Sequence, residues 1–196
     1  MRRSDATEKK IIQAALELFV RKGYHGTSIS DITHQVGLTK GALYSHLKSK
    51  SELLLKIIDQ FDKNFIDQLI KTGENIPGSA ADKLHRILSF STAFANENKD
   101  LCVFLTFLTF ELSAYPEFEG ALKSIYRKYQ KFISKIIKQG QKEGFFKKEL
   151  DADLAALTFI SIHDGTLHQW ALNRERLDGV RFVHNFRRIF FAGLMK

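Results

Sequence analysis

The 196-residue chain contains one cysteine, Cys102, and only two prolines. A lone cysteine excludes a disulfide framework within the chain and a zinc site built from several thiolates. Strict alternation of polar and apolar residues is also scarce, and apolar residues instead recur at steps of three and four. These patterns predict an all-α protein, and we expect it to hold no metal and no cofactor.

Long apolar runs are missing as well. The most apolar stretch, DLCVFLTFLTFEL at residues 100–112, is shorter than the roughly 20 apolar residues that a membrane-spanning helix needs. The first ten residues, MRRSDATEKK, lead into an amphipathic segment and not into the continuous apolar core of a signal peptide. We therefore expect a cytoplasmic protein without a membrane partner.

Negative charge is the scarcer sign, and the positive excess is unevenly distributed. The formal net charge is +8, and residues 1–50 hold nine Lys and Arg against four Asp and Glu, whereas the remainder holds 21 against 18. Phenylalanine is distributed in the opposite way, because only Phe19 of the 17 lies within the first 50 residues. A basic head (residues 1–50) and a phenylalanine-rich body (residues 51–196) therefore predict two domains with different partners.

Three short helices are predicted in the basic head. The first is apolar on one face and ends near Gly23, which suits a helix C-cap. Its apolar positions are Ile11, Ala14, Ala15, Leu18 and Phe19. The second begins at Ser28, where Asp31 completes a capping box, and it stops at Gly37. Two short helices joined by a tight turn at a glycine, in a basic domain, are typical of a helix-turn-helix.

The third helix, KGALYSHL at residues 40–47, is the candidate recognition helix, and Thr39 is placed to cap it. A lysine reaches base edges or phosphates, a glycine permits close backbone approach, and Tyr, Ser and His side chains hydrogen-bond phosphate oxygens. The residues expected to face DNA are Lys40, Gly41, Tyr44, Ser45 and His46, followed by Lys48 and Lys50. Ser49 and Glu52 then predict another capping box, which begins a fourth helix.

Several motifs occur in one register across the head. They are Phe19…Gly23-Tyr24, Thr27-Ser28…Asp31-Ile32, Gly37, Gly41-x-Leu43-Tyr44 and Lys48-Ser49-Lys50-x-Glu52-Leu53. On these residues, positions 11–55 resemble the DNA-binding domain of the TetR/AcrR (tetracycline-repressor) family of bacterial transcription regulators. The resemblance implies an N-terminal three-helix domain that docks on double-stranded DNA as half of a homodimer. It also implies that DNA, mostly through its phosphates, is contacted by Thr27 or Ser28, Thr39, Lys40, Tyr44, His46 and Lys50.

The body is predicted to be helical throughout. The fourth helix should continue to about Lys71, and TGENIPGSAAD at residues 72–82 carries the signals for a break. Further helices are predicted at residues 80–97, 100–113, 116–142, 152–173 and 179–195. In the resembled family the larger C-terminal helical domain binds a small ligand and supplies the dimer contact through its last two long helices. We expect the same homodimer here, with close helix contact at Gly165; the alternative is that a monomer's own core absorbs the apolar stripe of the last helix.

The helix predicted at residues 100–113 is apolar on two sides. We expect its leucine stripe to face the core and its phenylalanine stripe to line a mainly hydrophobic pocket, although a central helix buried all round gives the same pattern. A pocket with few polar groups suits a fatty acyl or aromatic ligand. The expected ligand-binding residues are Phe90, Phe94, Phe104, Phe107, Phe110, Glu111, Phe132, His163, Asp164 and Trp170.

The sequence thus predicts a ligand-responsive, homodimeric repressor that a small hydrophobic ligand releases from a palindromic operator. Two alternatives stay open. If Glu111 or Asp164 is buried and ionised beside aromatic rings, the ligand is a lipophilic cation, as for a multidrug-type regulator. If the head binds without sequence preference, the protein is a basic DNA-binding or membrane-surface protein. Catalysis is not expected, because no activated Ser or Cys arrangement is recognisable and His163 and His168 lie about 140° apart around a helix.

Overall fold

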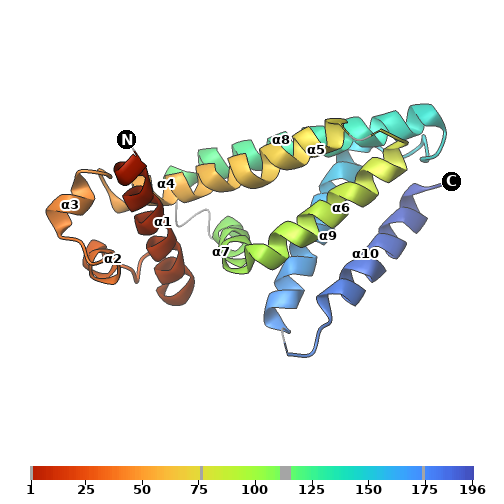
Figure 1. The fold of residues 1–196 in the computed structure, drawn as a ribbon. Coiled ribbons are helices and arrows are strands. Elements are labelled where there is room, and N and C mark those ends of the chain that lie inside the picture. Colours follow the sequence, from red (N-terminus) through yellow and green to blue (C-terminus); the bar gives the residue numbers. More distant parts are fainter. Residues whose placement is uncertain (1, 76, 111–115, 174) are drawn as a thin grey trace. The chain divides into compact units, whose positions relative to one another are not determined.

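The computed structural model describes residues 2–75, 77–110, 116–173 and 175–196, with side chains described except at residues 2–5, 107 and 110. In these ranges every regular element is a helix, and strand-like pairing is confined to one isolated bridge between Phe146 and Met195 (Figure 1). The predicted all-α fold is therefore confirmed. The elements are α1 (Arg2–Lys22), α2 (Ile29–Val36), α3 (Lys40–Tyr44), α4 (Lys50–Phe61), the π-helical turn η1 (Asp62–Ile66), α5 (Asp67–Asn75), α6 (Ala80–Glu97), α7 (Lys99–Phe110), α8 (Pro116–Glu143), α9 (Ala152–Leu172) and α10 (Gly179–Leu194).

Contacts divide the chain into two units, of which the first contains residues 1–62 and 100–122. In this unit α1 packs against α2 and α4, and α2 packs against α3. Phe19 of α1 stacks on Phe104 of α7 with 5.9 Å between ring centroids. Tyr24 meets the edge of Phe118 of α8 at 5.4 Å. Residues from α7 and the start of α8 thus share the core of the basic head.

This grouping by contacts does not test the predicted functional division into a head (residues 1–50) and a body (residues 51–196). That division stays a prediction. Residues 100–122 follow the head in sequence, but they are grouped with it because their apolar side chains are buried against it. Leu105 and Leu108 of α7 are 4% and 3% exposed. These leucines belong to the stripe that the sequence assigned to a core, and both are buried as expected.

The signals read at the helix ends of the head are present. Gly23 and Gly37 follow α1 and α2 with φ values of 74° and 69°, a region that glycine enters without a steric penalty. Ser28 and Asp31 form the predicted capping box at the start of α2. Thr39 caps α3, because its side-chain oxygen accepts a hydrogen bond from the backbone N–H of Ala42 at 3.1 Å.

Two details of the head differ from the prediction. Regular α-helical structure in α3 ends at Tyr44 and not at residue 47, although the N–H of Leu47 still donates to the carbonyl oxygen of Leu43 at 3.1 Å. At the start of α4, Ser49 accepts the N–H of Glu52 as expected, but the Glu52 carboxylate accepts the N–H of Lys48 at 2.6 Å. The carboxylate therefore satisfies a donor one residue earlier than in a capping box.

The second unit, residues 63–99 and 123–196, is built around aromatic rings. Phe159 of α9 lies 5.9 Å from Phe186 and 5.2 Å from Phe190 of α10, measured between ring centroids. Tyr129 of α8 approaches the same ring at 6.5 Å. Helix α5 packs against α6, and α9 packs against α10. The predicted helices of the body are thus all found, with bounds within a few residues of those expected, except that the end predicted at residue 113 lies outside the described residues.

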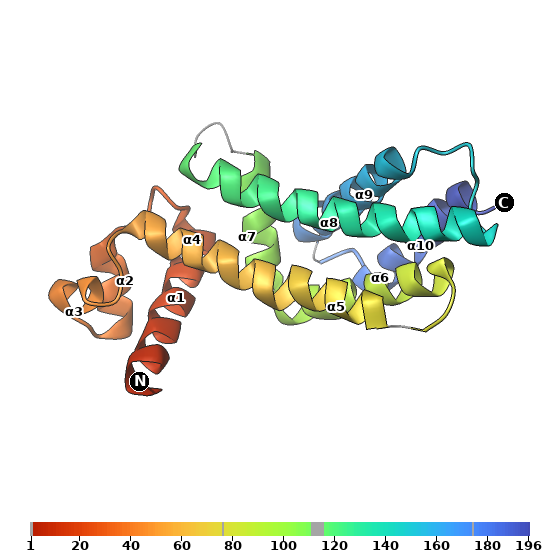
Figure 2. The same ribbon diagram turned by 90° about the horizontal axis from the view of Figure 1, so that it is seen from above.

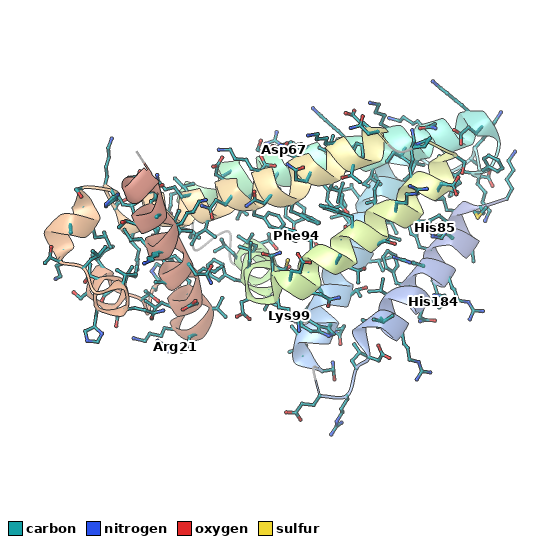
Figure 3. The ribbon with its side chains drawn as sticks, viewed as in Figure 1. Arg21, Asp67, His85, Phe94, Lys99 and His184 are labelled. Atoms are coloured by element: carbon teal, nitrogen blue, oxygen red, sulfur yellow. The ribbon has the colours of Figure 1, made fainter. Side chains whose placement is uncertain are left out.

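Helices α5 and α8 lie side by side in this unit, as Figure 2 shows. Two ion pairs join them: Lys128 to Asp67 at 2.5 Å and Lys135 to Glu74 at 2.9 Å. Asp67 is labelled in Figure 3. Phe132 lies between the ion-paired lysines in sequence and packs so closely on α5 that a side chain at Gly73 would meet its ring at 2.4 Å.

The helix predicted to run from the head into the body is continuous from Lys50 to Asn75, with the π-helical turn η1 inside it. A π-turn places one extra residue in the helix and shifts the faces on either side. Phe65 and Ile66 of this turn are 5% and 1% exposed. None of the helices in the described part of the chain combines the length and the continuous apolar character needed to cross a lipid bilayer.

Candidate DNA-binding surface and effector site

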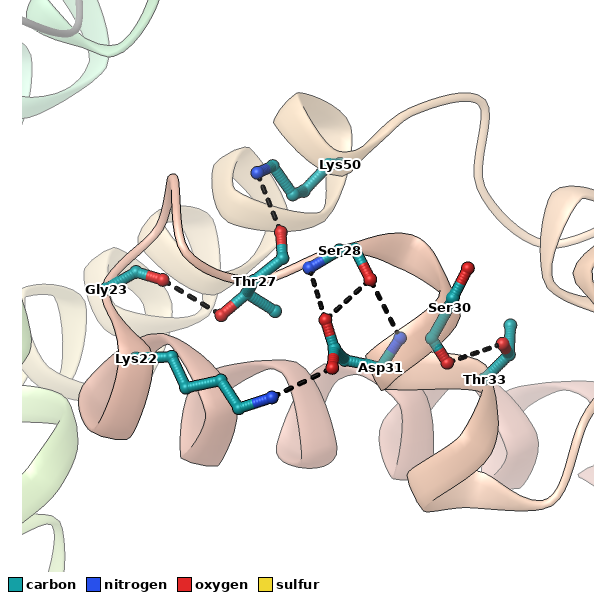
Figure 4. A network of polar contacts seen from close by, with 8 residues as sticks. All are labelled: Lys22, Gly23, Thr27, Ser28, Ser30, Asp31, Thr33 and Lys50. Carbon is teal, nitrogen blue, oxygen red and sulfur yellow. Dashed lines mark hydrogen bonds and ion pairs between the residues drawn. The ribbon is translucent and has the colours of Figure 1, made fainter.

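The start of α2 is held to the end of α1 by a polar network (Figure 4). Asp31 accepts the backbone N–H of Ser28 at 2.8 Å and pairs with Lys22 of α1 at 2.8 Å. The Lys22 ammonium and the Ser28 hydrogen bonds hold the pKa of Asp31 well below its usual range. The carboxylate is therefore charged across the physiological range, and it links the start of α2 to the end of α1.

Most of the residues expected to face DNA are exposed on and around α3. Tyr44 is 51% exposed. The remaining exposed members of the set are Ser28, Thr39, Lys40, Gly41, Ser45 and Lys48, and His46 is half-buried. An added Cβ at Gly41 would lie 4.0 Å from the nearest atom, so the backbone at this position is open to a close-lying ligand. Hydroxyl groups, lysine ammonium groups and accessible backbone N–H groups are the donors that bind the phosphates of DNA.

Thr27 and Lys50 lie elsewhere. Thr27 is 1% exposed, and its hydroxyl donates to the carbonyl oxygen of Gly23 at 2.9 Å. The Lys50 ammonium donates to the carbonyl oxygens of Tyr24 and Thr27, both at 2.8 Å, and lies 4.3 Å from the centroid of the Tyr24 ring. Burial lowers the pKa of Lys50. In this conformation both residues hold the loop before α2 in place, a role that the sequence pattern did not reveal.

The described phenylalanines among those predicted to line a ligand pocket each pack against a neighbour within their own unit. Phe90 and Phe94 of α6 both pack against Phe65, with centroid distances of 6.0 and 4.7 Å (Figure 3 labels Phe94). Phe132 packs on Gly73, and Phe104 stacks on Phe19 in the other unit. Glu111 and the side chains of Phe107 and Phe110 lie outside the described residues.

His163 and Trp170 do come together, in a cavity of about 60 Å³ between α6, α9 and α10. Burial lowers the pKa of His163 to about 4, so its ring is neutral at physiological pH. Gly179 places the start of α10 against the Trp170 ring, because an added Cβ would lie 3.2 Å from it. The lining residues that the sequence did not identify are Ser91, Thr92, Ala95, Asn96, Thr166, Leu167, Gly179, Phe182 and Val183.

Small side chains on α6 make this cavity difficult to predict from the sequence. The pattern favours the large Phe90 and Phe94 as lining residues, whereas the cavity is bounded by the adjacent small residues Ser91 and Ala95. The recurrence of Ser91 and Ala95 four positions apart was the available signal, because small residues on one helical face leave space next to a neighbouring helix.

Asp164 lies beside this cavity but is not part of its lining. Burial raises the pKa of its carboxyl to about 6, and a hydrogen bond from Tyr126 opposes the rise. The same carboxylate contributes to the raised pKa of the neighbouring Tyr129, whose main cause is burial. The carboxylate thus faces two tyrosines of α8. It does not line the cavity, as the alternative with a cationic ligand requires.

The outer faces of α9 and α10 carry exposed apolar residues. Leu154 of α9 is 63% exposed and Ile189 of α10 is 65% exposed, and both line an open groove of about 460 Å³ between the two helices. Further exposed apolar residues on these helices are Leu157, Leu172 and Val180. At Gly165 an added Cβ would meet nothing within 4 Å, so no close contact within the described chain accounts for a glycine there.

Two family models match the chain in succession. Residues 11–57 match the model described as bacterial regulatory proteins, tetR family, and residues 58–193 match that of the C-terminal region of YsiA-like protein. The first match covers the helix-turn-helix and the start of α4, and the second covers nearly all of the remaining chain.

Individual relatives agree with these models. The chain is 25% identical over 187 residues to the fatty acid metabolism regulator protein of Bacillus subtilis (strain 168), which covers 94% of each protein. It is 25% identical over 149 residues to the HTH-type transcriptional repressor KstR2 of Mycobacterium tuberculosis (strain ATCC 25618 / H37Rv), which covers 74% of this chain and 72% of the relative. These relatives are named as regulators and not as enzymes.

Solved structures show the same fold. The MbdR regulator from Azoarcus sp. CIB matches with a TM-score of 0.87 at 27% identity, over 97% of this chain and 100% of that one. FadR from Bacillus subtilis in complex with stearoyl-CoA matches with a TM-score of 0.81 at 24% identity, over 94% of this chain and 98% of that one. Because one family model spans more than half of the sequence and a helix-turn-helix head precedes it, the chain belongs to the TetR family of bacterial regulatory proteins.

Proposed function

We propose that the protein is a homodimeric transcriptional repressor that binds a palindromic operator and is released from it by a small hydrophobic effector. The observation that carries this proposal is the exposed polar set on and around α3, in a chain of the TetR family. Lys40, Tyr44 and Ser45 are exposed at the position of a recognition helix, and Thr39 caps the N-terminus of that helix. Contacts of this kind fix a helix on the phosphates beside the major groove.

The dimer contact is assigned to the outer faces of α9 and α10. Apolar side chains such as Leu154 and Ile189 are exposed to water, which is unfavourable for a contiguous apolar surface. Pairing with a second copy of the chain would bury them. A two-fold axis between the copies makes a four-helix bundle, in which the same patch faces itself. Such a dimer presents two recognition helices, and half-sites one helical turn of DNA apart, roughly 34–36 Å, are expected.

The effector is assigned to the fatty acyl class. The body is rich in aromatic and aliphatic side chains, and the relative of longest coverage among those above is named a fatty acid metabolism regulator. A relative of the same fold is described in complex with stearoyl-CoA. An effector that binds more tightly to a conformation unsuited to the operator spacing would release DNA by shifting the population of conformers.

The experiment is selection of bound duplexes from a random library, followed by affinity measurement on the selected sequence and on a scrambled duplex of the same length. We expect an inverted repeat that binds at least 100-fold more tightly than the scrambled duplex. Lys40→Ala should weaken operator binding and lower the salt dependence by about one ion per protomer. Lys148→Ala, which removes an exposed lysine of the body, is the matched control and should leave both unchanged. Equal affinity for selected and scrambled DNA would instead establish non-specific binding by a basic protein.

A further inference from the structure

The cavity between α6, α9 and α10 has an unusual polar side. The hydroxyl of Ser91 is on a side chain that is 1% exposed, and it has no hydrogen-bond partner among the described residues. The hydroxyl of Tyr129, on a side chain 4% exposed, lies close enough to the Ser91 hydroxyl to oppose the rise in its pKa, but no hydrogen bond of good geometry joins the two or reaches either from another described residue. A buried hydroxyl without a partner has lost its hydration without compensation, and a ligand group that hydrogen-bonds to it restores that loss.

His163 supplies the second polar function of the cavity. Its imidazole makes no hydrogen bond to any described residue, and as a neutral ring it has one N–H donor and one nitrogen acceptor. The two threonines in the lining are engaged differently, because Thr92 donates to the Leu88 carbonyl oxygen at 2.7 Å and Thr166 donates to that of Ile162 at 2.6 Å. Asn96 of the lining is exposed to solvent, so Ser91 and His163 are the more enclosed side chains left to meet a ligand.

Among the residues that the structure describes, no Lys, Arg, Asp or Glu lines the cavity. Lys99, labelled in Figure 3, lies 5.7 Å from the centroid of the Trp170 ring, and Asp164 faces Tyr126 and Tyr129, so neither belongs to the lining. A charged group that entered would lose its hydration without gaining a counter-charge, which costs far more than burying an uncharged polar group. Aromatic walls from Trp170 and Phe182 favour apolar atoms next to that group.

The size of the cavity limits what enters. Its volume of about 60 Å³ exceeds the roughly 10–15 Å³ that one water needs and falls below the roughly 150 Å³ of a cavity that accepts benzene. It therefore accommodates the end of a molecule, a few atoms long, and not a whole effector.

We propose that this cavity recognises an uncharged hydrogen-bonding group at the end or branch of an apolar effector, such as a hydroxyl, an ester or thioester carbonyl, or an amide, through Ser91 and His163. This inference rests on the proposed function, in which an apolar effector enters the body. The specificity that follows is rejection of a free carboxylate and of an ammonium on the same apolar chain.

Trp170 is the only tryptophan of the sequence and lines the cavity, so its fluorescence reports occupancy directly. The probes are 1-octanol, octanoate and octylamine, which share a chain and differ in charge. We expect 1-octanol to shift Trp170 emission with an affinity at least tenfold higher than either charged probe. Ser91→Ala and His163→Phe should each remove most of that preference, and Ser124→Ala, an exposed serine of α8, should leave it intact.

Several results overturn the inference. Equal affinity for the three probes, preference for either charged one, or no change of Trp170 emission with any of them would each do so. A preference for 1-octanol that survives in Ser91→Ala and His163→Phe would place recognition elsewhere. Operator affinity of the same preparations separates the two proposals, because specific DNA binding that persists while the probe preference fails leaves the proposed function standing.

Discussion

The Lys50 side chain makes its contacts within the head itself. Its ammonium satisfies two carbonyl oxygens of the loop between α1 and α2 and lies over the ring of Tyr24. The family resemblance implies a DNA contact for this residue, and the geometry adds a structural role that acts before any DNA arrives. The two roles make different predictions for stability.

Lys50→Met keeps most of the side-chain stem but removes the ammonium, so the carbonyl oxygens of Tyr24 and Thr27 lose a charged donor. We expect a loss of about 1.5–3 kcal/mol in the free energy of unfolding. For a chain of this length, this corresponds to a fall in Tm of about 4–10 °C, measured by circular dichroism without DNA. Lys48→Met, at an exposed neighbour, is the control and should change Tm by less than about 2 °C. A similar Tm for both variants would show that the Lys50 contacts contribute nothing to folding.

Asp164 gives a pH dependence with a definite sign. Its pKa is raised to about 6 in the folded protein, mainly by burial, against an ordinary value of 3.8. Above pH 6 the carboxylate is ionised in both the folded and the unfolded protein, and its burial destabilises the fold. As the pH falls from 6 towards 4, the folded protein binds the proton before the unfolded protein does. The destabilisation is therefore relieved at low pH. The corresponding gain in the free energy of unfolding is at most about 3 kcal/mol, and partial exposure of the side chain makes it smaller.

Asp164→Asn removes this titration and can still accept a hydrogen bond from Tyr126. We expect the variant to be more stable than the wild type at pH 7.5, by about 1–2 kcal/mol, and the difference to shrink towards zero near pH 4. Thermal unfolding of both proteins across this pH range measures it, and other titrating groups cancel in the difference. A constant difference at every pH would contradict a raised pKa for this carboxyl.

At the scale of elements, helix order was predictable because periodicity and caps act locally. Ser28, Thr39 and Gly37 mark helix ends through hydrogen bonds and φ values that involve only their neighbours in sequence. The helix α7 was predicted for the same reason. Its partners were not, because stacking of Phe104 on Phe19 joins residues far apart in sequence.

The candidate sites were predictable to different degrees. Exposure of Lys40 and Tyr44 follows from the spacing of buried residues on a short helix, and α3 presents them as expected. The effector cavity depends on which side chains leave space unfilled. Sequence reading identified His163 and Trp170 but favoured large residues over Ser91, whose importance appears only when its missing hydrogen-bond partner is seen in three dimensions.

Gly165 in the middle of α9 tests the proposed dimer face. An added side chain meets nothing within the described chain at Gly165, and the same holds at Gly120 of α8. Replacing either glycine should favour its own helix by about 1 kcal/mol. We expect Gly165→Lys to dissociate the dimer in sedimentation equilibrium and Gly120→Lys to leave it intact. If both variants have the mass of the wild type, close contact at Gly165 is not part of the dimer.

At the scale of the whole molecule, the account requires that binding in the body changes the affinity of the head for DNA. By linkage, an effector that lowers operator affinity must itself bind less tightly to the DNA-bound dimer, by the same factor. Occupancy of the effector site and occupancy of the operator therefore have to be measured on the same sample. The single tryptophan supplies the first signal, and a fluorophore on the operator duplex supplies the second.

The most direct measurement is the fluorescence anisotropy of the selected operator bound to the dimer, as stearoyl-CoA is added, with coenzyme A alone as the control. The account predicts at least a tenfold loss of operator affinity with stearoyl-CoA and none with coenzyme A. Unchanged operator affinity, at concentrations where Trp170 emission shows the effector site to be saturated, would contradict ligand-controlled repression.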